Sequence, residues 1–445
     1  MHVQDFIHDL RFSDLPAPVM VMARRCLLDL IGVAASGRRT DLARIVTNHA
    51  ARQFGAGEGR GARMIFDGRR VSPVGAAYAG ASLIDSFDAH DGHALTKGHA
   101  GVAILPALLA FWEAEDLALD DQDVLTSIVI GYEIATRAGI ALHASACDYH
   151  TSGAWNSLAC AAIGARLMKL SPAQTREALG TAEYHGPRSQ MMRCIDYPTM
   201  LKDGSGWGAL VGVSAAYLAA DGFTGAPALT LEAPEQQALW GDLGSRWYIL
   251  DQYFKPYPVC RWAQPAVQAA RDLMSQHGLT GADIADVEVR TFAEAVRLHS
   301  ARPATTEEAQ YSLPFPLAAM ILRGRIGADE ITGAGLRDAE VLDLSSSIRL
   351  VEDPQICARF PAERFAVVSL GTRDGRRVTS EWTQAHGGPE NPQSDAEISA
   401  KYQALAGQLG DNRRQAIETM IAGMGTGAPA GDLADLVLEP IGDAA

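Results

Sequence analysis

The chain has 445 residues and a formal net charge of −15, from 38 lysine and arginine residues against 53 aspartate and glutamate residues. Hydrophobic residues make up 47% of the sequence, which excludes a disordered chain because that apolar content can fill a large core. The acidity argues against a nucleic-acid binder or a protein that docks on anionic membranes, since both need a basic surface.

The cysteines and the apolar segments indicate where the protein works. The six cysteines are scattered and form no CxxC pair, so we expect free thiols in a reducing compartment. The N-terminal segment has an early Asp5 and no apolar h-region, which predicts no signal peptide. The longest apolar stretch, 124–140, contains Glu133 and Arg137 and predicts no membrane span. We therefore predict a cytoplasmic protein with no membrane or nucleic-acid partner.

The first 250 residues predict one helix after another. From Asp123 onward apolar residues recur at helical spacing, and Glu133 and Arg137 lie one turn apart, where they can pair on the helix surface. Ser171-Pro172-Ala173-Gln174 predicts a helix start, with Ser as N-cap and Gln three residues later. Small residues at 206, 208, 212, 215 and 216 predict a helix packed closely against its neighbours.

The pattern changes after about Tyr253. Residues 287–292 alternate as a strand does, and 365–370 and 377–380 flank an Asp374-Gly375 turn, which predicts a hairpin. A helical stretch, 307–323, lies between these strands. This segment therefore predicts a smaller α+β unit.

A Gly- and Pro-rich linker, 387–392, follows this unit, and helical pattern returns from Asp395. We expect the short C-terminal tail to pack back on the first helices. The prediction is a mainly α protein with a large all-helical domain, 1–252 with 392–445, and a smaller α+β lid domain, 253–391.

The most polar segment runs from Asp85 to His99 and holds three of the twelve histidines. It lies between apolar helical stretches, 74–84 and 102–112, so we expect it at the end of a helical hairpin. Three interpretations stay open: a wall of acid/base groups, which is favoured, a polar surface loop, and a divalent-metal site. The metal site would use Asp88, His90, Asp91 and His93.

Three further groups follow along the chain. His150 precedes a helix at 154–168, whose dipole disfavours a protonated imidazole, although a cap or loop histidine is the commoner interpretation. A stretch between helices carries Arg188, Arg193 and Lys202, which either hold substrate carboxylates or are surface charges. A lysine there can also act as acid or base if its pKa is lowered. The third group, around Lys255, falls at the predicted domain boundary, where clefts form.

The sequence offers no phosphate-binding loop. Gly204-Ser205-Gly206-Trp207-Gly208 follows no predicted strand and lacks the GxGxxG spacing, and no GxxxxGK[ST] exists. Ser214 lies inside a helical pattern and lacks the second glycine of a nucleophile elbow. We take Cys260 as a buried thiol. These observations predict no nucleotide cofactor and no serine or cysteine nucleophile.

Taken in order, the polar groups resemble the MmgE/PrpD family, which includes 2-methylcitrate dehydratase, cis-aconitate decarboxylase and iminodisuccinate epimerase. The resemblance runs over most of the chain. It is carried by the Asp85–His99 segment with Ile104-Leu105-Pro106-Ala107, Gly131–Arg137, Tyr149-His150-Thr151, Lys202 with Ala219–Gly225, Lys255–Cys260, Tyr311-Ser312-Leu313-Pro314-Phe315, and Asn391-Pro392 leading to Lys401-Tyr402.

The resemblance implies a large helical domain, a smaller lid, a homodimer, no organic cofactor and no metal, with a site between the domains for a small di- or tricarboxylate. Carried over by position, the catalytic candidates are Asp85, His99, His150 and Lys202. Lys255 resembles the family's substrate-binding lysine. Further substrate-binding candidates are Arg188, Arg193, Tyr257 and His90.

The sequence also departs from the family pattern. The run Asp85-Ser86-Phe87-Asp88-Ala89 lacks the two adjacent acids common in the first motif. Phe315 stands where the decarboxylase resemblance would place a tyrosine hydroxyl, and the histidine that many members carry after the lid's Cys motif falls near Gln264. Neither the decarboxylase nor the methylcitrate dehydratase assignment therefore transfers intact.

The family resemblance predicts a cofactor-independent lyase that abstracts a proton next to a carboxylate, of the 2-methylcitrate dehydratase type. An epimerase or isomerase is the runner-up and a decarboxylase comes third. In the expected mechanism His150 or Lys202 is the base, His99, tuned by Asp85, is the acid, and the basic side chains hold carboxylates. From other classes, a metal-dependent hydrolase and a non-catalytic carboxylate-binding protein stay open.

Overall fold

The computed structural model describes residues 2–57 and 59–442. Helices account for 57% of the residues and strands for 9%, so the predicted mainly α character is confirmed. The outermost residues of the predicted helical domain, 1 and 443–445, lie outside the described residues. All six cysteines are free thiols, as the sequence predicts.

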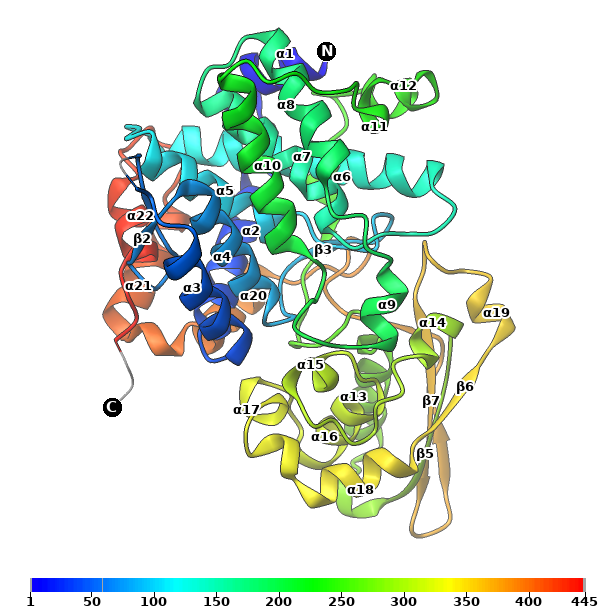
Figure 1. Ribbon diagram of the computed structural model, residues 1–445. Coiled ribbons are helices and arrows are strands. Elements are labelled where there is room, and N and C mark those ends of the chain that lie inside the picture. The colour runs from blue at the N-terminus through cyan, green and yellow to red at the C-terminus, as the bar shows by residue number, and fades with distance from the viewer. Residues whose placement is uncertain (1, 58, 443–445) are drawn as a thin grey trace.

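The helices of the first 240 residues pack into one body (Figure 1). They are α1 Val3–Asp9, α2 Ala17–Gly37, α3 Asp41–Gln53, α4 Pro73–Asp85, α5 Gly101–Ala114, α6 Asp121–Ser145, α7 Gly153–Leu167, α8 Pro172–His185, α9 Met191–Asp196, α10 Ser205–Ala220, α11 Leu229–Glu232 and α12 Gln237–Trp240, with 3-10 turns at Phe12–Asp14, Pro234–Gln236 and Tyr248–Asp251. Two short antiparallel pairs join them, β1 Ala62–Arg63 with β2 Arg70–Val71 and β3 Gly92–His93 with β4 Gln252–Tyr253.

Local signals in the sequence fix several of these helices. Ser171 accepts from the backbone N–H of Gln174 and completes the predicted capping box at the start of α8. In α10, a Cβ at Gly208 would lie 2.3 Å from Asn156 Oδ1, and one at Gly212 would lie 2.2 Å from the Ser157 carbonyl oxygen on α7. Only glycine permits this approach, so the predicted close packing of α10 is confirmed.

Helix α6 lies in the core of this body. By length and composition alone it could cross a membrane, but 94% of its most apolar window is buried between other elements. The predicted surface pair of Glu133 and Arg137 is wrong, because both side chains are fully buried. Arg137 Nε donates to Glu133 at 3.2 Å, and Glu133 also accepts from the backbone N–H of Ile249. The i, i+4 spacing predicts a shared face of the helix, but the fold decides that this face is buried.

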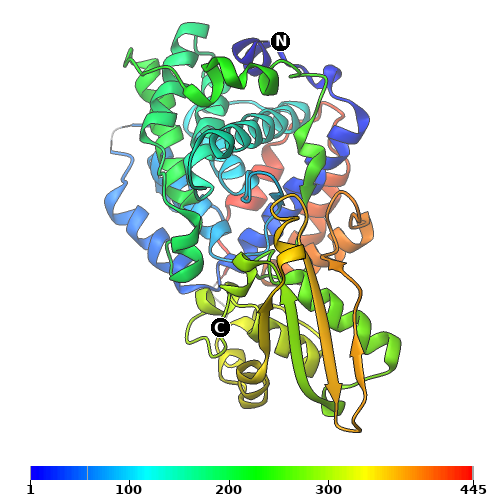
Figure 2. The same cartoon turned by 90° about the vertical axis from the view of Figure 1, so that its right-hand side faces the viewer.

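Residues 264–384 form a five-stranded sheet covered by helices (Figure 2). The strand order is β6-β5-β7-β8, with β9 also on β7; β5 pairs parallel with β6, and the other pairs are antiparallel. The elements are α13 Gln264–His277, β5 Ile284–Thr291, α14 Ala293–Val296, α15 Thr306–Gln310, α16 Pro314–Arg323, α17 Ala328–Ile331, α18 Ala339–Ser347, β6 Arg349–Glu352, α19 Pro354–Cys357, β7 Phe365–Thr372, β8 Arg377–Thr379 and β9 Thr383–Gln384, with 3-10 turns at Gly281–Asp283 and Gly335–Arg337.

The predicted strands and hairpin of this part are confirmed. Strands β7 and β8 pair in register from Ser369 with Thr379 to Gly371 with Arg377, around a turn in which Gly375 has a φ of +88°. The predicted helix 307–323 is instead two helices, because the chain leaves helical geometry at Tyr311 after α15 and a new helix begins at Pro314, where a missing N–H costs nothing.

The C-terminal helices return to the first body, as the sequence predicts. They are α20 Asp395–Leu405, α21 Asp411–Ala422 and α22 Gly431–Leu438, with a 3-10 turn at Gly407–Leu409. Helix α20 packs against α2, and Lys401 Nζ donates to Asp29 on α2 and, at 2.6 Å, to the Ala89 carbonyl. The Phe254 N–H donates to the Gly387 carbonyl at 2.9 Å, so the chain leaves the α+β part beside its entry. The domain boundaries at 252 and 391 stay a prediction.

Replacing Arg137 with Met is expected to lower the free energy of unfolding by about 3–5 kcal/mol, because Glu133 would stay buried without its cation. Urea denaturation followed by circular dichroism measures this change. Arg359→Met is the control, since Arg359 pairs with Glu363 on an exposed surface and is expected to cost at most about 0.5 kcal/mol. Equal losses in the two variants would contradict the buried-pair interpretation.

Candidate active site

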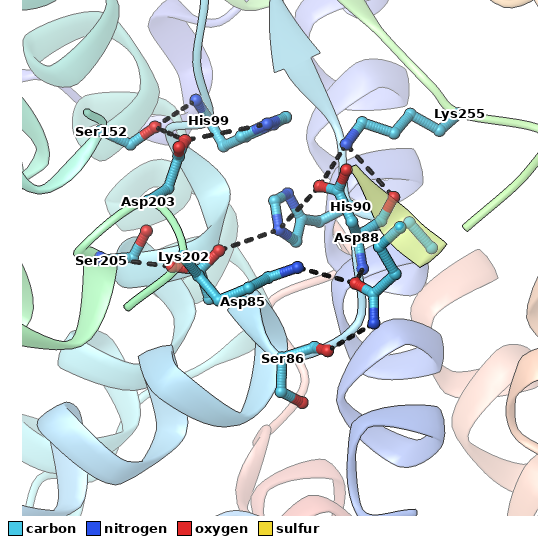
Figure 3. A network of polar contacts seen from close by, with 12 residues as sticks. Asp85, Ser86, Asp88, His90, His99, Ser152, Lys202, Asp203, Ser205 and Lys255 are labelled. Atoms are coloured by element: carbon cyan, nitrogen blue, oxygen red, sulfur yellow. Dashed lines mark hydrogen bonds and ion pairs between the residues drawn. The ribbon is translucent and has the colours of Figure 1, made fainter. Parts of the chain in front are cut away.

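Buried polar side chains from four separate segments meet at one place, which we call the polar cluster (Figure 3). The loop between α4 and α5 supplies part of it, the turn before α10 and the segment after β4 supply more, and the end of α15 completes it. Its members are Asp85, Asp88, His90, His99, Lys202, Asp203, Lys255 and Gln310. Five of the predicted site residues therefore lie together: Asp85, His90, His99, Lys202 and Lys255.

An ion pair joins the α4–α5 loop to the segment after β4. Lys255 Nζ donates to Asp88 Oδ1 at 2.6 Å and to the Asp88 carbonyl at 3.2 Å, and both side chains are almost fully buried. Burial alone would raise the pKa of Asp88, but the Lys255 and Lys202 ammonium groups hold that pKa well below its usual range. Asp88 is therefore an ionised carboxylate that fixes Lys255.

Gln310 connects this pair to Lys202. Its Oε1 accepts from Lys202 Nζ at 2.7 Å and from the Asp88 N–H at 2.9 Å, and its Nε2 donates to the Ser86 carbonyl at 3.2 Å. The ammonium of Lys202 also lies 4.6 Å from the ring centroid of Tyr311. Lys202 has a φ of +48°, a left-handed conformation that turns the chain just before α10.

His99 is held in one tautomer. Its Nδ1 lies 2.5 Å from the Asp91 carbonyl oxygen, which can only accept, so Nδ1 carries the proton and Nε2 presents a lone pair. Burial, with the Lys255 ammonium and His90 nearby, lowers the pKa of His99 well below its ordinary value. The imidazole is therefore neutral at pH 7, with Nε2 as a potential base.

Asp203 faces this lone pair. Its Oδ2 lies 3.9 Å from His99 Nε2 and accepts from Ser152 Oγ at 2.5 Å. Burial and the nearby Asp85 carboxylate raise the pKa of Asp203 to about 7. A carboxyl group with this pKa can donate or accept a proton near neutrality.

Asp85 contacts His90, whereas the sequence analysis assigned it to His99. Its Oδ2 accepts from the Ser205 N–H at the start of α10 at 3.3 Å, and its Oδ1 lies 3.6 Å from His90 Nε2. The prediction that Asp85 tunes His99 is wrong, because Asp203 occupies that place. His90 and His99 nevertheless belong to one unit, since their ring centroids are 4.2 Å apart.

The remaining predicted site residues make their contacts away from the cluster. His150 Nδ1 lies 3.2 Å from the Arg188 carbonyl, and its Nε2 lies 3.6 Å from Asp148. The Tyr257 hydroxyl accepts from Arg271 on α13 at 3.2 Å. The side chains of Arg188 and Arg193 are exposed to solvent, as the surface-charge interpretation expects.

Two pockets flank Lys202; of the eight cluster members, Lys202 lines both pockets and Asp85 lines one. The Asp85 pocket, of about 420 Å³, is lined by Asp85, Ser82 and Tyr78. The Arg193 pocket, of about 270 Å³, is lined by Arg193, Thr151 and Cys194. Both pockets share the turn 199–204 and Trp207 as a wall. A small anion that enters the Arg193 pocket therefore meets Lys202.

A metal site is geometrically possible but not in the predicted form. The ligand atoms of Asp88, His90 and His99 lie within 4.8 Å of one another. Asp91 instead accepts from the Tyr132 hydroxyl, and His93 faces Asp251 at 4.0 Å, so two of the four predicted ligands point elsewhere. Because the Lys255 ammonium donates to Asp88, a divalent cation there would have to displace or repel a buried positive charge.

Sequence reasoning missed Asp203, Ser152 and Gln310 as parts of the site. Asp203 directly follows Lys202 in a Gly-rich turn, and this placement of an acid in apolar surroundings was the one available signal. Ser152 and Gln310 gave no signal, because their roles depend on contacts across 51 and 108 positions of the chain.

Two family models match consecutive parts of the chain. The model of the MmgE/PrpD N-terminal domain matches residues 2–239, and that of the MmgE/PrpD C-terminal domain matches residues 257–424. The chain belongs to the MmgE/PrpD family. The MmgE/PrpD resemblance read from the sequence is thereby confirmed.

Several curated members of the MmgE/PrpD family are similar over nearly their whole length. Cis-aconitate decarboxylase-like protein oryM of Aspergillus oryzae is 24% identical, over 97% of this chain and 96% of its own. Cis-aconitate decarboxylase of Homo sapiens is 25% identical, over 91% and 86%. Cis-aconitate decarboxylase of Aspergillus terreus is 23% identical, over 94% and 91%.

Replacing Asp203 with Asn is expected to change how stability depends on pH. A carboxyl group whose pKa rises on folding, here from 3.8 to about 7, stabilises the fold fully below pH 3.8 and loses this contribution as the pH rises through 7. The free energy of unfolding of the wild type, minus that of the Asn variant, should therefore fall by roughly 1.4 kcal/mol per pH unit between about pH 5 and 7 and level off above 8.

Urea denaturation at a series of pH values measures this difference. Asp411→Asn is the control, because the Asp411 side chain is 92% exposed, and its difference from the wild type should stay nearly flat. A difference for Asp203→Asn that rises with pH would contradict the raised pKa.

Proposed function

We propose that this protein is a cofactor-independent lyase that moves a proton at a carbon beside a carboxylate of a small di- or tricarboxylate. The observation that carries the proposal is the pairing of a neutral imidazole with a carboxyl group of pKa about 7, in a buried site that also holds two lysines. This set supplies a base, an acid and cations for developing negative charge. Membership of the MmgE/PrpD family and the names of similar proteins, such as cis-aconitate decarboxylase, support a small di- or tricarboxylate as the substrate.

Each group has a distinct role in the proposed mechanism. His99 Nε2 takes the proton from the substrate carbon, because its lone pair is free and faces the cluster. Lys202 and Lys255 hold substrate carboxylates and offset the charge that develops on the enediolate. Asp203 returns a proton, either to carbon or to a departing hydroxyl group. Asp85, through His90, and Asp88, through Lys255, keep these groups oriented.

Two predicted residues keep their candidate roles in this proposal. His150 is the second candidate for the base, because its neighbour Thr151 lines the Arg193 pocket. Arg193 is proposed to attract the substrate at the mouth of that pocket. The Arg188 side chain is exposed and the Tyr257 hydroxyl accepts from Arg271, so both are weaker candidates for substrate contact. A homodimer in the cytoplasm stays our expectation from the family resemblance.

Dehydration of a hydroxy-polycarboxylate is the first choice for the reaction, since Asp203 can protonate a leaving hydroxyl near neutral pH. Decarboxylation is the second candidate, favoured by the names of the similar proteins. Phe315 is buried on α16 and offers no hydroxyl, but the Tyr311 ring contacts Lys202 and brings a phenol to the same region. Epimerisation needs only removal and return of the proton and is the third candidate.

Proton NMR in D₂O tests the proposal with citrate, 2-methylcitrate, cis-aconitate and aspartate-derived imino acids. Deuterium entering a substrate carbon is the expected result. Loss of water, loss of CO₂, or exchange without a new product then separates dehydration, decarboxylation and epimerisation. No exchange with any member of the panel would contradict the proposed substrate class.

Replacing Lys202 with Met and, separately, His99 with Gln is expected to lower kcat/KM by about 10²-fold or more, because each variant removes a charge-stabilising or proton-transferring group. His150→Gln ranks the two candidate bases, since the true base should show the larger loss in kcat. Lys169→Met, at an exposed lysine after α7, is the control and should keep full activity. Full activity in both the Lys202 and His99 variants would contradict the assigned roles.

A further inference from the structure

A separate polar pocket, which we call the arginine pocket, has Tyr253 in its wall. It has a volume of about 200 Å³ and lies where the loop after β3 meets the α+β part of the chain. Its walls include Tyr253, Arg261, Arg364, Glu363 and Glu390. Tyr253 also lies near the cluster, since its ring centroid is 6.4 Å from that of His99.

Two buried guanidinium groups share one aromatic ring in this pocket. The guanidinium carbon of Arg261 lies 4.6 Å from the Tyr253 ring centroid, and that of Arg364 lies 5.8 Å from it. Each arginine is only 8% exposed. Two buried like charges beside one ring are costly unless an anion compensates them. Burial lowers the pKa of Arg261 to about 10, and the positive charge of Arg364 adds to this effect.

Most of the N–H groups of the two arginines are not engaged by protein acceptors. Arg261 donates to the carbonyls of Phe254, Ala385 and His386, and Arg364 donates to that of Ala94. In the part of the chain that the structure describes, these four bonds leave six of the ten guanidinium N–H groups without a protein acceptor. Within residues 2–57 and 59–442, the buried Arg364 Nε has no partner.

The carboxylates in the walls form no hydrogen bond to either arginine in the described part of the chain. Glu363 bonds to Arg359 instead. Glu390 acts on Arg261 only through its electrostatic field, since no hydrogen bond joins the two in the described part of the chain. The pocket therefore presents buried, unfilled donors in a protein with a net charge of −15.

We propose that the arginine pocket binds a small anion whose group carries at least two neighbouring oxygens, a carboxylate or a phosphate, between Arg261 and Arg364. The planar guanidinium fork suits such a group because it can donate two parallel N–H bonds. The volume corresponds to roughly seven water molecules at ~30 Å³ each, which restricts the ligand to a small ion. This site is separate from the proposed catalytic function and does not rest on it.

An ion in the arginine pocket would lie next to the loop that leads to His99. Arg364 donates to the Ala94 carbonyl at 2.8 Å, on the loop that leads to His99. Tyr253 pairs with Gly92 across the β3–β4 ladder on the same loop. A bound ion would therefore lie beside two residues, Arg364 and Tyr253, that contact this loop.

Isothermal titration calorimetry in chloride-free buffer tests the proposal with sodium phosphate and, in a separate experiment, sodium succinate. The wild type is expected to bind at least one of them with a Kd in the millimolar range or below. Lys202→Met, which removes a cation of the cluster, should change this Kd by less than about twofold. Arg364→Gln should weaken binding at least tenfold, whereas Arg359→Gln, at the exposed neighbour, should not.

Each possible result of the titrations either supports or contradicts the proposed anion site. A preference for phosphate or for succinate identifies the source of the bound group. No binding of either ion up to ~20 mM, unchanged binding in Arg364→Gln, or loss of binding in Lys202→Met alone would overturn the proposal. If circular dichroism shows that Arg364→Gln is unfolded, Arg364→Lys replaces it, because it keeps the charge but loses the fork. Wild-type affinity in that variant would also overturn the proposal.

Discussion

The buried ion pair between Lys255 and Asp88 is the contact on which the site depends. Asp88 belongs to the loop that follows α4, and Lys255 belongs to the segment that enters the α+β part, so the pair ties the two parts together at their boundary. Neither charge is tolerable alone at this depth. Gln310 extends the pair to Lys202, so the two lysines are positioned by one network that reaches across the whole chain.

The same burial divides the acid and base roles. Desolvation disfavours charge on His99 and on Asp203 alike, which leaves one as a neutral base and the other as a carboxyl group that titrates near pH 7. Perturbed groups of this kind gather at functional sites, because a carboxyl group of ordinary pKa would be ionised at neutral pH and could not donate a proton.

Sequence patterns predicted what local chemistry controls. The capping box at Ser171 and the β7–β8 hairpin are written in a few neighbouring residues, and each is found where expected. The family resemblance also predicted Asp85, His99 and other members of the cluster as site residues. The pairing within the cluster was not predictable, because the choice of Asp203 over Asp85 as the neighbour of His99 depends on how α4 and α10 pack. Burial of the Glu133–Arg137 pair likewise depends on the fold and not on spacing.

A crystal structure with propane-1,2,3-tricarboxylate, an unreactive tricarboxylate, would test the central claim most directly. The account predicts carboxylate oxygens within hydrogen-bond distance of Lys202 and Lys255, with a substrate carbon facing His99 Nε2. Electron density for the ligand only outside the polar cluster, for example in the arginine pocket, would contradict the assignment of the catalytic site.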